Sequence, residues 1–182
     1  TTTTRLLAHI VKNNGKRVGF TTSDGIYIQN TLLQKGDTTG PMSAEFILKD
    51  PTVEFAVLET ARGGILRSGL GFGTCDIGVL TNIKEDHLGI SDIHNLKDLT
   101  RVNADDEYSM RLADDLRAKV ALFSLDENNP HIKKFAKEGK ITCVFEEGFV
   151  TIKKGEWKIR IEKVKNIPIT MEGKAKFMIA NV

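Results

Sequence analysis

Two short apolar runs, each followed at once by polar residues, constrain the fold of this chain most. Residues 55–58 (FAVL) lead into Glu59, and residues 76–80 (DIGVL) lead into a polar stretch that contains Asn82 and His87. Short apolar runs of this kind are typical of strands covered on both faces by helices. Ligands of such sheets bind beyond the carboxyl ends of the strands, where a carboxylate and an imidazole can meet around one metal ion. The two runs therefore predict one shared site.

The rest of the chain alternates between helical and strand patterns. Helices are expected over 1–14, 43–49, 108–118 and 130–137, a further helix start within 173–182, and strands over 17–21, 27–28, 55–58, 76–80 and 120–123. Between 141 and 170, apolar or alternating runs are separated by Glu147-Gly148 and Lys154-Gly155, which are hairpin signals. We therefore predict an α/β fold: a mostly parallel sheet flanked by helices, with a small antiparallel β-sheet over 141–170 near the C-terminal end.

Composition excludes several classes of protein. A length of 182 residues favours one domain, and 40% hydrophobic with 27% charged residues is ordinary for a globular protein. A net charge of +2 argues against a dedicated nucleic-acid binder. The two cysteines lack metal-type spacing, which favours reduced thiols in the cytoplasm. The sequence has neither a membrane-length apolar run nor a secretory signal pattern, so we expect no membrane partner.

Six motifs, in order over nearly the whole chain, resemble the central ATP-binding domain of the Mur ligase superfamily. They are TTTTRL (1–6), TSDGIYI (22–28), GDTTGP (36–41), LETARGGILR (58–67), TNI with DHLG (81–89), and NADD (103–106). The fourth and fifth motifs together are highly specific. The arginine-rich fourth motif and TSDGIYI favour the cyanophycin synthetase branch over the cell-wall and folate branches. The resemblance implies a P-loop-type sheet, ATP and Mg²⁺ as cofactors, and amide-bond synthesis.

The resemblance also implies a nucleotide site at the start of the chain. Family members carry a phosphate-binding Gly-Thr-Asn-Gly-Lys loop directly before the position of Thr1. By position, Thr1 is then the hydroxyl that touches Mg²⁺, and Thr2 lies beside the phosphates at a helix start, which favours anions. Asn82 and Asn181 are the other expected nucleotide contacts, the latter to adenine. The alternative is that the threonines merely cap a helix.

Glu59 and His87 are the expected catalytic residues and, together with Thr1, the expected metal ligands. A carboxylate at a strand end is a hard oxygen ligand that suits Mg²⁺. The resemblance makes His87 a second metal contact or an orienting residue near the acyl phosphate. The alternatives are a solvated strand-end glutamate and a structural histidine.

Substrate-binding residues are expected on three segments. Arg62 and Arg67 flank two glycines beside Glu59, and guanidinium groups bind carboxylates in a bidentate fork, which suits an acidic polymer or peptide acceptor. An exposed basic loop is the alternative. A second segment, Thr38, Thr39 and Gly40, is expected to form a substrate-facing loop. Asp24 is expected to contact an amine or an ordered water.

We interpret residues 1–182 as one Mur ligase-like central domain and as a fragment of a longer chain. The abrupt start, and the jump from a helix-like run into NADD, predict residues missing before 1 and between 102 and 103. No lysine stands where the family's carbamylated lysine is expected, so none is assigned. Without the upstream lysine loop, the fragment alone is expected to be inactive.

Two classes of function follow. The first is an ATP-dependent acid–amino acid ligase that acts through an acyl phosphate, with the addition of arginine to the aspartate side chain of a polymer as its most concrete form. Another Mur-type amide ligase is the nearest alternative. The second class is a non-catalytic nucleotide-binding module. The parent protein is expected to be a cytoplasmic homo-oligomer.

Overall fold

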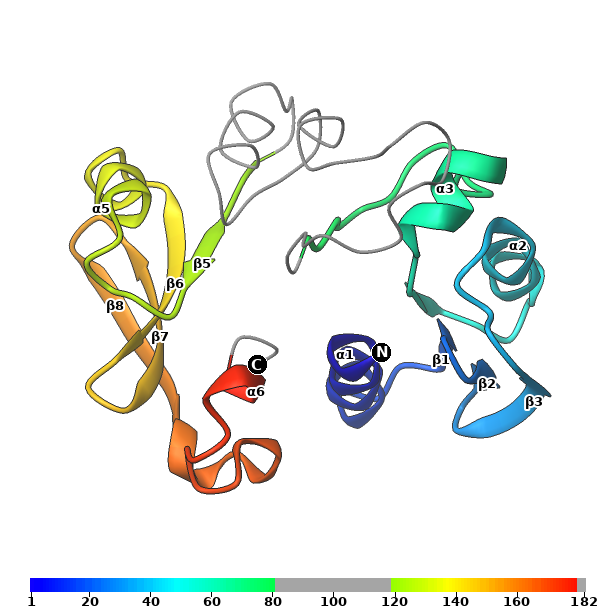
Figure 1. Cartoon of the computed structure of the whole chain (residues 1–182), viewed down its shortest axis with the longest axis horizontal. Helices are drawn as coiled ribbons and strands as arrows, with labels where there is room; N and C mark the ends of the chain where they lie inside the picture. The colour runs from blue at the N-terminus through cyan, green and yellow to red at the C-terminus, as the bar shows by residue number, and fades with distance from the viewer. Residues whose placement is uncertain (81–118, 180–182) are drawn as a thin grey trace. The chain divides into compact units, whose positions relative to one another are not determined.

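The computed structural model describes residues 1–80 and 119–179, which belong to two compact units (Figure 1). The first unit contains residues 1–79, and the second contains residues 119–179. Each unit has its own four-stranded sheet. Within these described ranges, no helix is both long enough and apolar enough to cross a membrane.

The first unit is a mixed sheet with strand order β3-β2-β1-β4. Its elements are α1 (Thr2–Asn13), β1 (Val18–Thr22), β2 (Gly25–Ile28), β3 (Thr31–Lys35), α2 (Pro41–Lys49), β4 (Phe55–Leu58) and α3 (Arg62–Ser68). β1 and β4 are parallel, whereas β1 with β2 and β2 with β3 are antiparallel. The chain passes from α1 directly into β1. The helix α2 lies in the connection that leads from β3 to β4.

Helices cover both faces of β1. On one face, Ala8 of α1 packs against Val18 and Phe20 in the buried core. On the other face, a Cβ atom added to Gly19 would stand 2.8 Å from the Val53 side chain, which is closer than real Cβ atoms approach, and 3.0 Å from the Ile47 side chain of α2, which is a tight contact. A glycine at this position therefore lets α2 pack directly on the strand. All five residues of β1 are buried.

The second unit is a βαβ crossover that continues into two hairpins, with strand order β5-β6-β7-β8. Its elements are β5 (Leu122–Ser124), α5 (Pro130–Lys137), β6 (Ile141–Glu146), β7 (Phe149–Lys154), β8 (Trp157–Lys163), the 3-10 helices η1 (Val164–Asn166) and η2 (Pro168–Thr170), and α6 (Lys176–Ile179). Only β5 and β6 are parallel, joined through α5; the other two pairs are antiparallel.

Local sequence explains these elements. The Asn129 side chain accepts hydrogen bonds from the backbone N–H groups of His131 and Ile132, which starts α5 at Pro130. The turn from β6 to β7 places Glu147 and Gly148 at φ values of 50° and 82°. Two consecutive left-handed residues match the twist of a tight hairpin, and a glycine takes that conformation without strain.

Several sequence predictions are confirmed. The helix predicted over 130–137 has those bounds, and the antiparallel strands predicted between 141 and 170 are β6, β7 and β8. The helix start predicted within 173–182 corresponds to α6. The helix predicted over 108–118 lies outside the described residues.

Other predictions are wrong. Residues 76–80 form no strand, and Ile77 and Val79 are 74% and 57% exposed. None of the described strands pairs with this run. The strand predicted over 27–28 is part of β2, and an unpredicted strand, β3, pairs beyond it. All five β3 residues are exposed, so no apolar alternation marks this strand in the sequence.

Candidate functional site

The parallel pairing of β1 and β4 places their carboxyl ends side by side. Thr21 is opposite Leu58 in the register, and the Glu59 N–H donates a hydrogen bond to the Thr21 carbonyl at 3.3 Å. Glu59 therefore lies next to the turn that follows β1, which consists of Ser23 and Asp24. This is the edge of the sheet where parallel folds bind ligands.

The start of α1 completes the arrangement at this edge. The Thr1 hydroxyl donates to Glu59 Oε1 at 3.0 Å and lies 2.6 Å from the Ser23 hydroxyl. Thr1 is the N-cap residue of α1, but its side chain makes no capping hydrogen bond. Helix capping therefore does not account for the Thr1 hydroxyl. We call Thr1, Ser23 and Glu59 the Glu59 site.

The Glu59 site has the donor set of a hard cation. Its oxygens come from one carboxylate and two hydroxyls, and the Glu59 side chain is 21% exposed. Within the described part of the chain, Glu59 Oε2 is buried without a hydrogen-bond partner. A buried carboxylate oxygen without a partner is costly unless a cation or donor satisfies it. The residues present therefore fit Mg²⁺, which prefers such oxygens.

A second cluster lies next to the Glu59 site and consists of Arg5, Asp24 and Tyr27; we call it the Arg5 cluster. Arg5 donates to Asp24 Oδ2 at 2.5 Å and to the Tyr27 hydroxyl at 3.0 Å. Tyr27 donates to the same carboxylate oxygen at 2.9 Å, and the buried Thr22 hydroxyl donates to the other oxygen. Hydrogen bonds from Thr22 and Tyr27, and then the charge of Arg5, lower the pKa of Asp24. Both Asp24 oxygens thus have partners within the protein.

The loop at 38–40 is fixed by buried hydroxyls. Thr38 is 2% exposed, and its hydroxyl donates to the Thr22 carbonyl at 2.7 Å. The Thr39 hydroxyl donates to Asp37 at 2.7 Å, and Gly40 is the N-cap residue of α2. The two side chains are therefore bonded inside the first unit. The substrate contacts expected for this loop and for Asp24 stay predictions.

The arginine-rich segment packs against this loop as a helix. α3 begins at Arg62, and a Cβ atom on Gly64 would stand 3.3 Å from the Thr39 carbonyl, so the glycine allows close approach. Arg67 in the last turn is close enough to Asp37 to help lower the pKa of that carboxyl, after the hydrogen bonds from Thr39. The structure thus brings together two of the three expected substrate segments.

Comparison with known proteins decides the family. The Mur ligase middle domain matches residues 1–182, which is the whole chain. The chain belongs to the Mur ligase middle-domain family. It is 49% identical to a cyanophycin synthetase of Geminocystis herdmanii, 50% identical to one of Synechocystis sp. and 48% identical to one of Crocosphaera subtropica, each over all of this chain. The chain spans 22% to 23% of the length of these relatives.

In this Mur ligase middle domain, Thr1 and Glu59, two of the three expected metal ligands, are in direct contact, and their role as ligands stays a prediction. Thr2 is half-buried in the first turn of α1. Three predicted residues, Asn82, His87 and Asn181, lie outside the described residues. Across the described ranges, no group of three or more His, Cys, Asp or Glu side chains is placed to hold a metal ion. A cation at the Glu59 site would therefore rely on hydroxyl oxygens as well as on its single carboxylate.

Sequence reasoning did not assign a role to Ser23 or Arg5. In the sequence, Ser23 stands only as part of the TSDGIYI motif. Its position directly after β1, the parallel neighbour of β4, is a signal that could have placed it beside Glu59. The partner of Arg5 has no such signal, because it depends on how α1 docks on the sheet.

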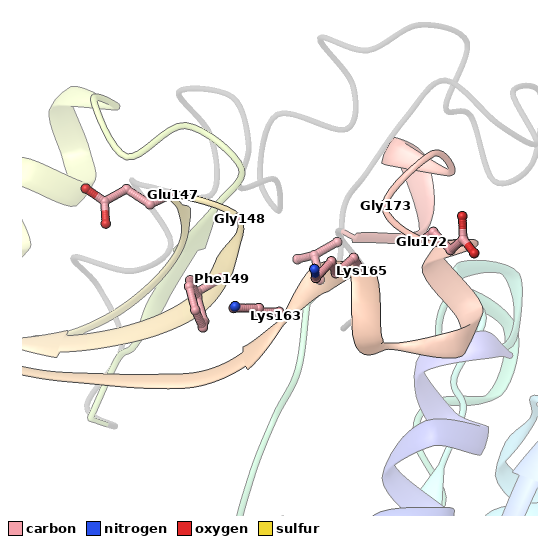
Figure 2. Close-up of a pocket in the computed structure, with 8 residues that line it drawn as sticks. Glu147, Gly148, Phe149, Lys163, Lys165, Glu172 and Gly173 are labelled. Carbon is pink, nitrogen blue, oxygen red and sulfur yellow. The ribbon is translucent and has the colours of Figure 1, made fainter.

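The second unit of this Mur ligase middle domain contains an open pocket of about 340 Å³ (Figure 2). It is lined by Glu147, Gly148, Phe149, Lys163, Val164, Lys165, Glu172 and Gly173. Glu147 and Glu172 form ion pairs with Arg160 and Lys174, and Figure 2 shows their carboxylates turned away from the space between the two lysines. None of the residues that line it is a predicted site residue or belongs to the Glu59 site.

Proposed function

We propose that this chain is the ATP-binding part of an ATP-dependent acid–amino acid ligase. The observation that carries the proposal is the Glu59 site, an oxygen donor set at the carboxyl edge of a parallel strand pair and at the start of a helix. Cyanophycin synthetases that are 48% to 50% identical to the chain support the ligase class. The resemblance of the arginine-rich motif and of TSDGIYI to the cyanophycin synthetase branch supports the finer proposal that arginine is added to aspartate side chains of an acidic polymer.

In the proposed reaction, an acceptor carboxylate attacks the terminal phosphate of ATP, ADP leaves, and an amine then displaces phosphate from the acyl phosphate. Mg²⁺, when bound, supplies positive charge where two anions approach each other. Thr1, Ser23 and Glu59 would hold the metal ion. The N–H groups in the first turn of α1, such as that of Thr2, favour phosphate oxygens there.

We infer the roles of the remaining predicted site residues from their positions in the sequence and in the first unit. Arg62 and Arg67 on α3 would hold acceptor carboxylates, because guanidinium groups bind them in a bidentate fork. The 38–40 loop, which packs on α3, would border the same acceptor, and Asp24 would reach an amine or a water. His87 would act as a second metal contact, and Asn82 and Asn181 would contact the nucleotide.

The proposal includes a longer parent protein with a P-loop-type, mostly parallel sheet. The alignments to the relatives cover 197 positions, whereas this chain has 182 residues. This difference supports an internal gap, which we place between residues 102 and 103. The cytoplasmic location, the homo-oligomeric state and the absence of nucleic-acid or membrane partners also stay predictions.

Replacing Glu59 by Gln in the full-length protein tests the proposal. Loss of the charge that would hold the metal should lower ADP release by orders of magnitude, since several kcal/mol of stabilisation is lost. Glu54→Gln is a matched control, because Glu54 precedes β4 at its opposite end and accepts a hydrogen bond from the Arg17 N–H. Near-normal ligation by the Glu59 variant would exclude the metal role.

The same assay separates the alternatives. ADP release that depends on an amino acid and a polyaspartate-type acceptor indicates the ligase, and arginine should be preferred over other amino acids. Preference for a different amino acid would indicate another Mur-type amide ligase. Nucleotide binding without any ADP release would indicate a non-catalytic module.

A further inference from the structure

The Arg5 cluster and the Glu59 site share one face of α1. The Arg5 N–H donates to the Thr1 carbonyl at 3.0 Å, so Arg5 is one helical turn after Thr1 and points to the same side. Each of these residues contacts one of the two turn residues after β1. Thr1 contacts Ser23 at 2.6 Å, and Arg5 contacts Asp24 at 2.5 Å.

The Arg5 cluster is anchored in the core of the first unit. The Tyr27 ring stacks on the ring of Phe20, with centroids 4.7 Å apart and planes 5° apart, and Phe20 is 5% exposed. The Arg5 guanidinium lies 4.9 Å from the centre of the Tyr27 ring, within the range of a cation–π contact. Asp24 is also bonded to the fully buried Thr22. The turn is therefore held by the sheet and by α1 together.

We propose that Arg5 is a positioning residue for the divalent cation of the Glu59 site. By clamping Asp24, it holds the neighbouring Ser23 hydroxyl against the Thr1 hydroxyl, which in turn donates to Glu59. This inference rests on the proposed function. The Arg5 and Asp24 side chains are 43% and 51% exposed, so their ion pair contributes little to overall stability. Its loss should instead change cation binding.

Calorimetric titration of the full-length protein with Mg²⁺, in the presence of a non-hydrolysable ATP analogue, tests the proposal. Arg5→Ala should weaken Mg²⁺ binding by about three- to tenfold, the range for loss of a cation–π contact and a partly exposed ion pair. Arg5→Lys should recover part of this loss. Tyr27→Phe removes only the hydroxyl and should weaken Mg²⁺ binding by about twofold, which keeps the test decisive if Arg5→Ala does not fold.

Arg17→Ala is the matched control. Arg17 precedes β1 at the end opposite Ser23 and also forms an ion pair, with Glu54, and a hydrogen bond to the Thr52 carbonyl at 2.8 Å. It should leave Mg²⁺ binding unchanged. Equal losses in the Arg5 and Arg17 variants would overturn the proposal, because the effect would then be general destabilisation.

A double-mutant cycle tests whether Arg5 acts through Ser23. In a Ser23→Ala background, Arg5→Ala should cause no further loss of Mg²⁺ affinity; fully additive losses would overturn the proposal.

Hydrogen exchange without nucleotide provides an independent readout. The amides of residues 23–25 should exchange faster in Arg5→Ala than in Arg17→Ala, and equal rates would also overturn it. Failure of the wild-type protein to bind Mg²⁺ and nucleotide would instead reject the proposed function, while hydrogen exchange still decides whether Arg5 holds the turn.

Discussion

Replacing Glu146 by Gln should destabilise the second unit at neutral pH and should have little effect in acid. Glu146 ends β6, and its side chain is 11% exposed. It forms ion pairs with Lys153 of β7, at 2.7 Å, and with Lys158 of β8. One carboxylate therefore joins three adjacent strands.

The magnitude follows from the pKa of this carboxyl. Hydrogen bonds from Lys153 and then Lys158 lower the pKa of Glu146 from its ordinary value of 4.5 to about 2. Each pKa unit corresponds to about 1.4 kcal/mol, so the ionised form adds on the order of 3 kcal/mol to the free energy of unfolding. Because the pKa is lower in the folded state, this contribution is fully present above pH 4.5. It is lost progressively as the pH falls through 4.5 towards 2.

Urea unfolding followed by tryptophan fluorescence measures the effect. Trp157 is the only tryptophan of the chain and directly precedes Lys158 in β8, so its signal reports on the second unit. At pH 7, Glu146→Gln should lower the free energy of unfolding by about 2–3 kcal/mol. At pH 2 the difference from wild type should shrink below about 1 kcal/mol, because the folded-state pKa is about 2 and about half of the wild-type carboxylate is then protonated.

Glu147→Gln is the matched control for this experiment. Glu147 is adjacent in the sequence and pairs with Arg160 of β8, but its side chain is 66% exposed. An exposed pair of this kind contributes about 0–1 kcal/mol, so the control should change the free energy of unfolding little at any pH. A Glu146→Gln effect that is equal at pH 7 and pH 2.5, or no larger than the control, would refute the reasoning.

Two further predictions concern the acceptor and the α5 cap. Replacing Arg62 and Arg67 by Ala in the full-length protein should raise the acceptor KM at least about tenfold, since each charged hydrogen-bonded contact contributes roughly 1.5–3 kcal/mol. ATP affinity, measured by calorimetry on the same protein, should stay nearly constant, and the opposite pattern would move both arginines to the nucleotide site. Asn129→Ala removes the side chain that accepts from two backbone N–H groups at the start of α5, so it should lower the free energy of unfolding by about 1 kcal/mol. An unchanged urea midpoint would show that this cap is dispensable.

Local patterns in the sequence were sufficient to predict the elements that position the residues of the Glu59 site. The apolar run 55–58 becomes β4, and the helix predicted to begin at the threonines becomes α1. Parallel strands align their carboxyl ends, so Glu59 could be predicted to lie near Thr1, and the two are in direct contact. The motifs of the Mur ligase resemblance lie on the same segments, and the family match over the whole chain agrees with them.

The same patterns failed where burial does not follow local composition. The run 76–80 is apolar but exposed and forms no strand, whereas residues 31–35, which are also exposed, form the edge strand β3. An edge strand is held by backbone hydrogen bonds to one neighbour, and its side chains need not alternate between core and solvent. Periodicity therefore gave no information about β3.

The sequence by itself determined the family, the order of most elements and the carboxylate of the candidate site. Only the tertiary structure showed that Ser23 lies against Thr1 and that Arg5 clamps Asp24, pairs that are 22 and 19 residues apart. Helical and strand periodicity specify which face of each element is buried, but they do not specify which polar side chains meet when α1 docks on β1. Those contacts depend on the packing of Ala8 against Val18 and Phe20, which sets the position of the whole helix at once.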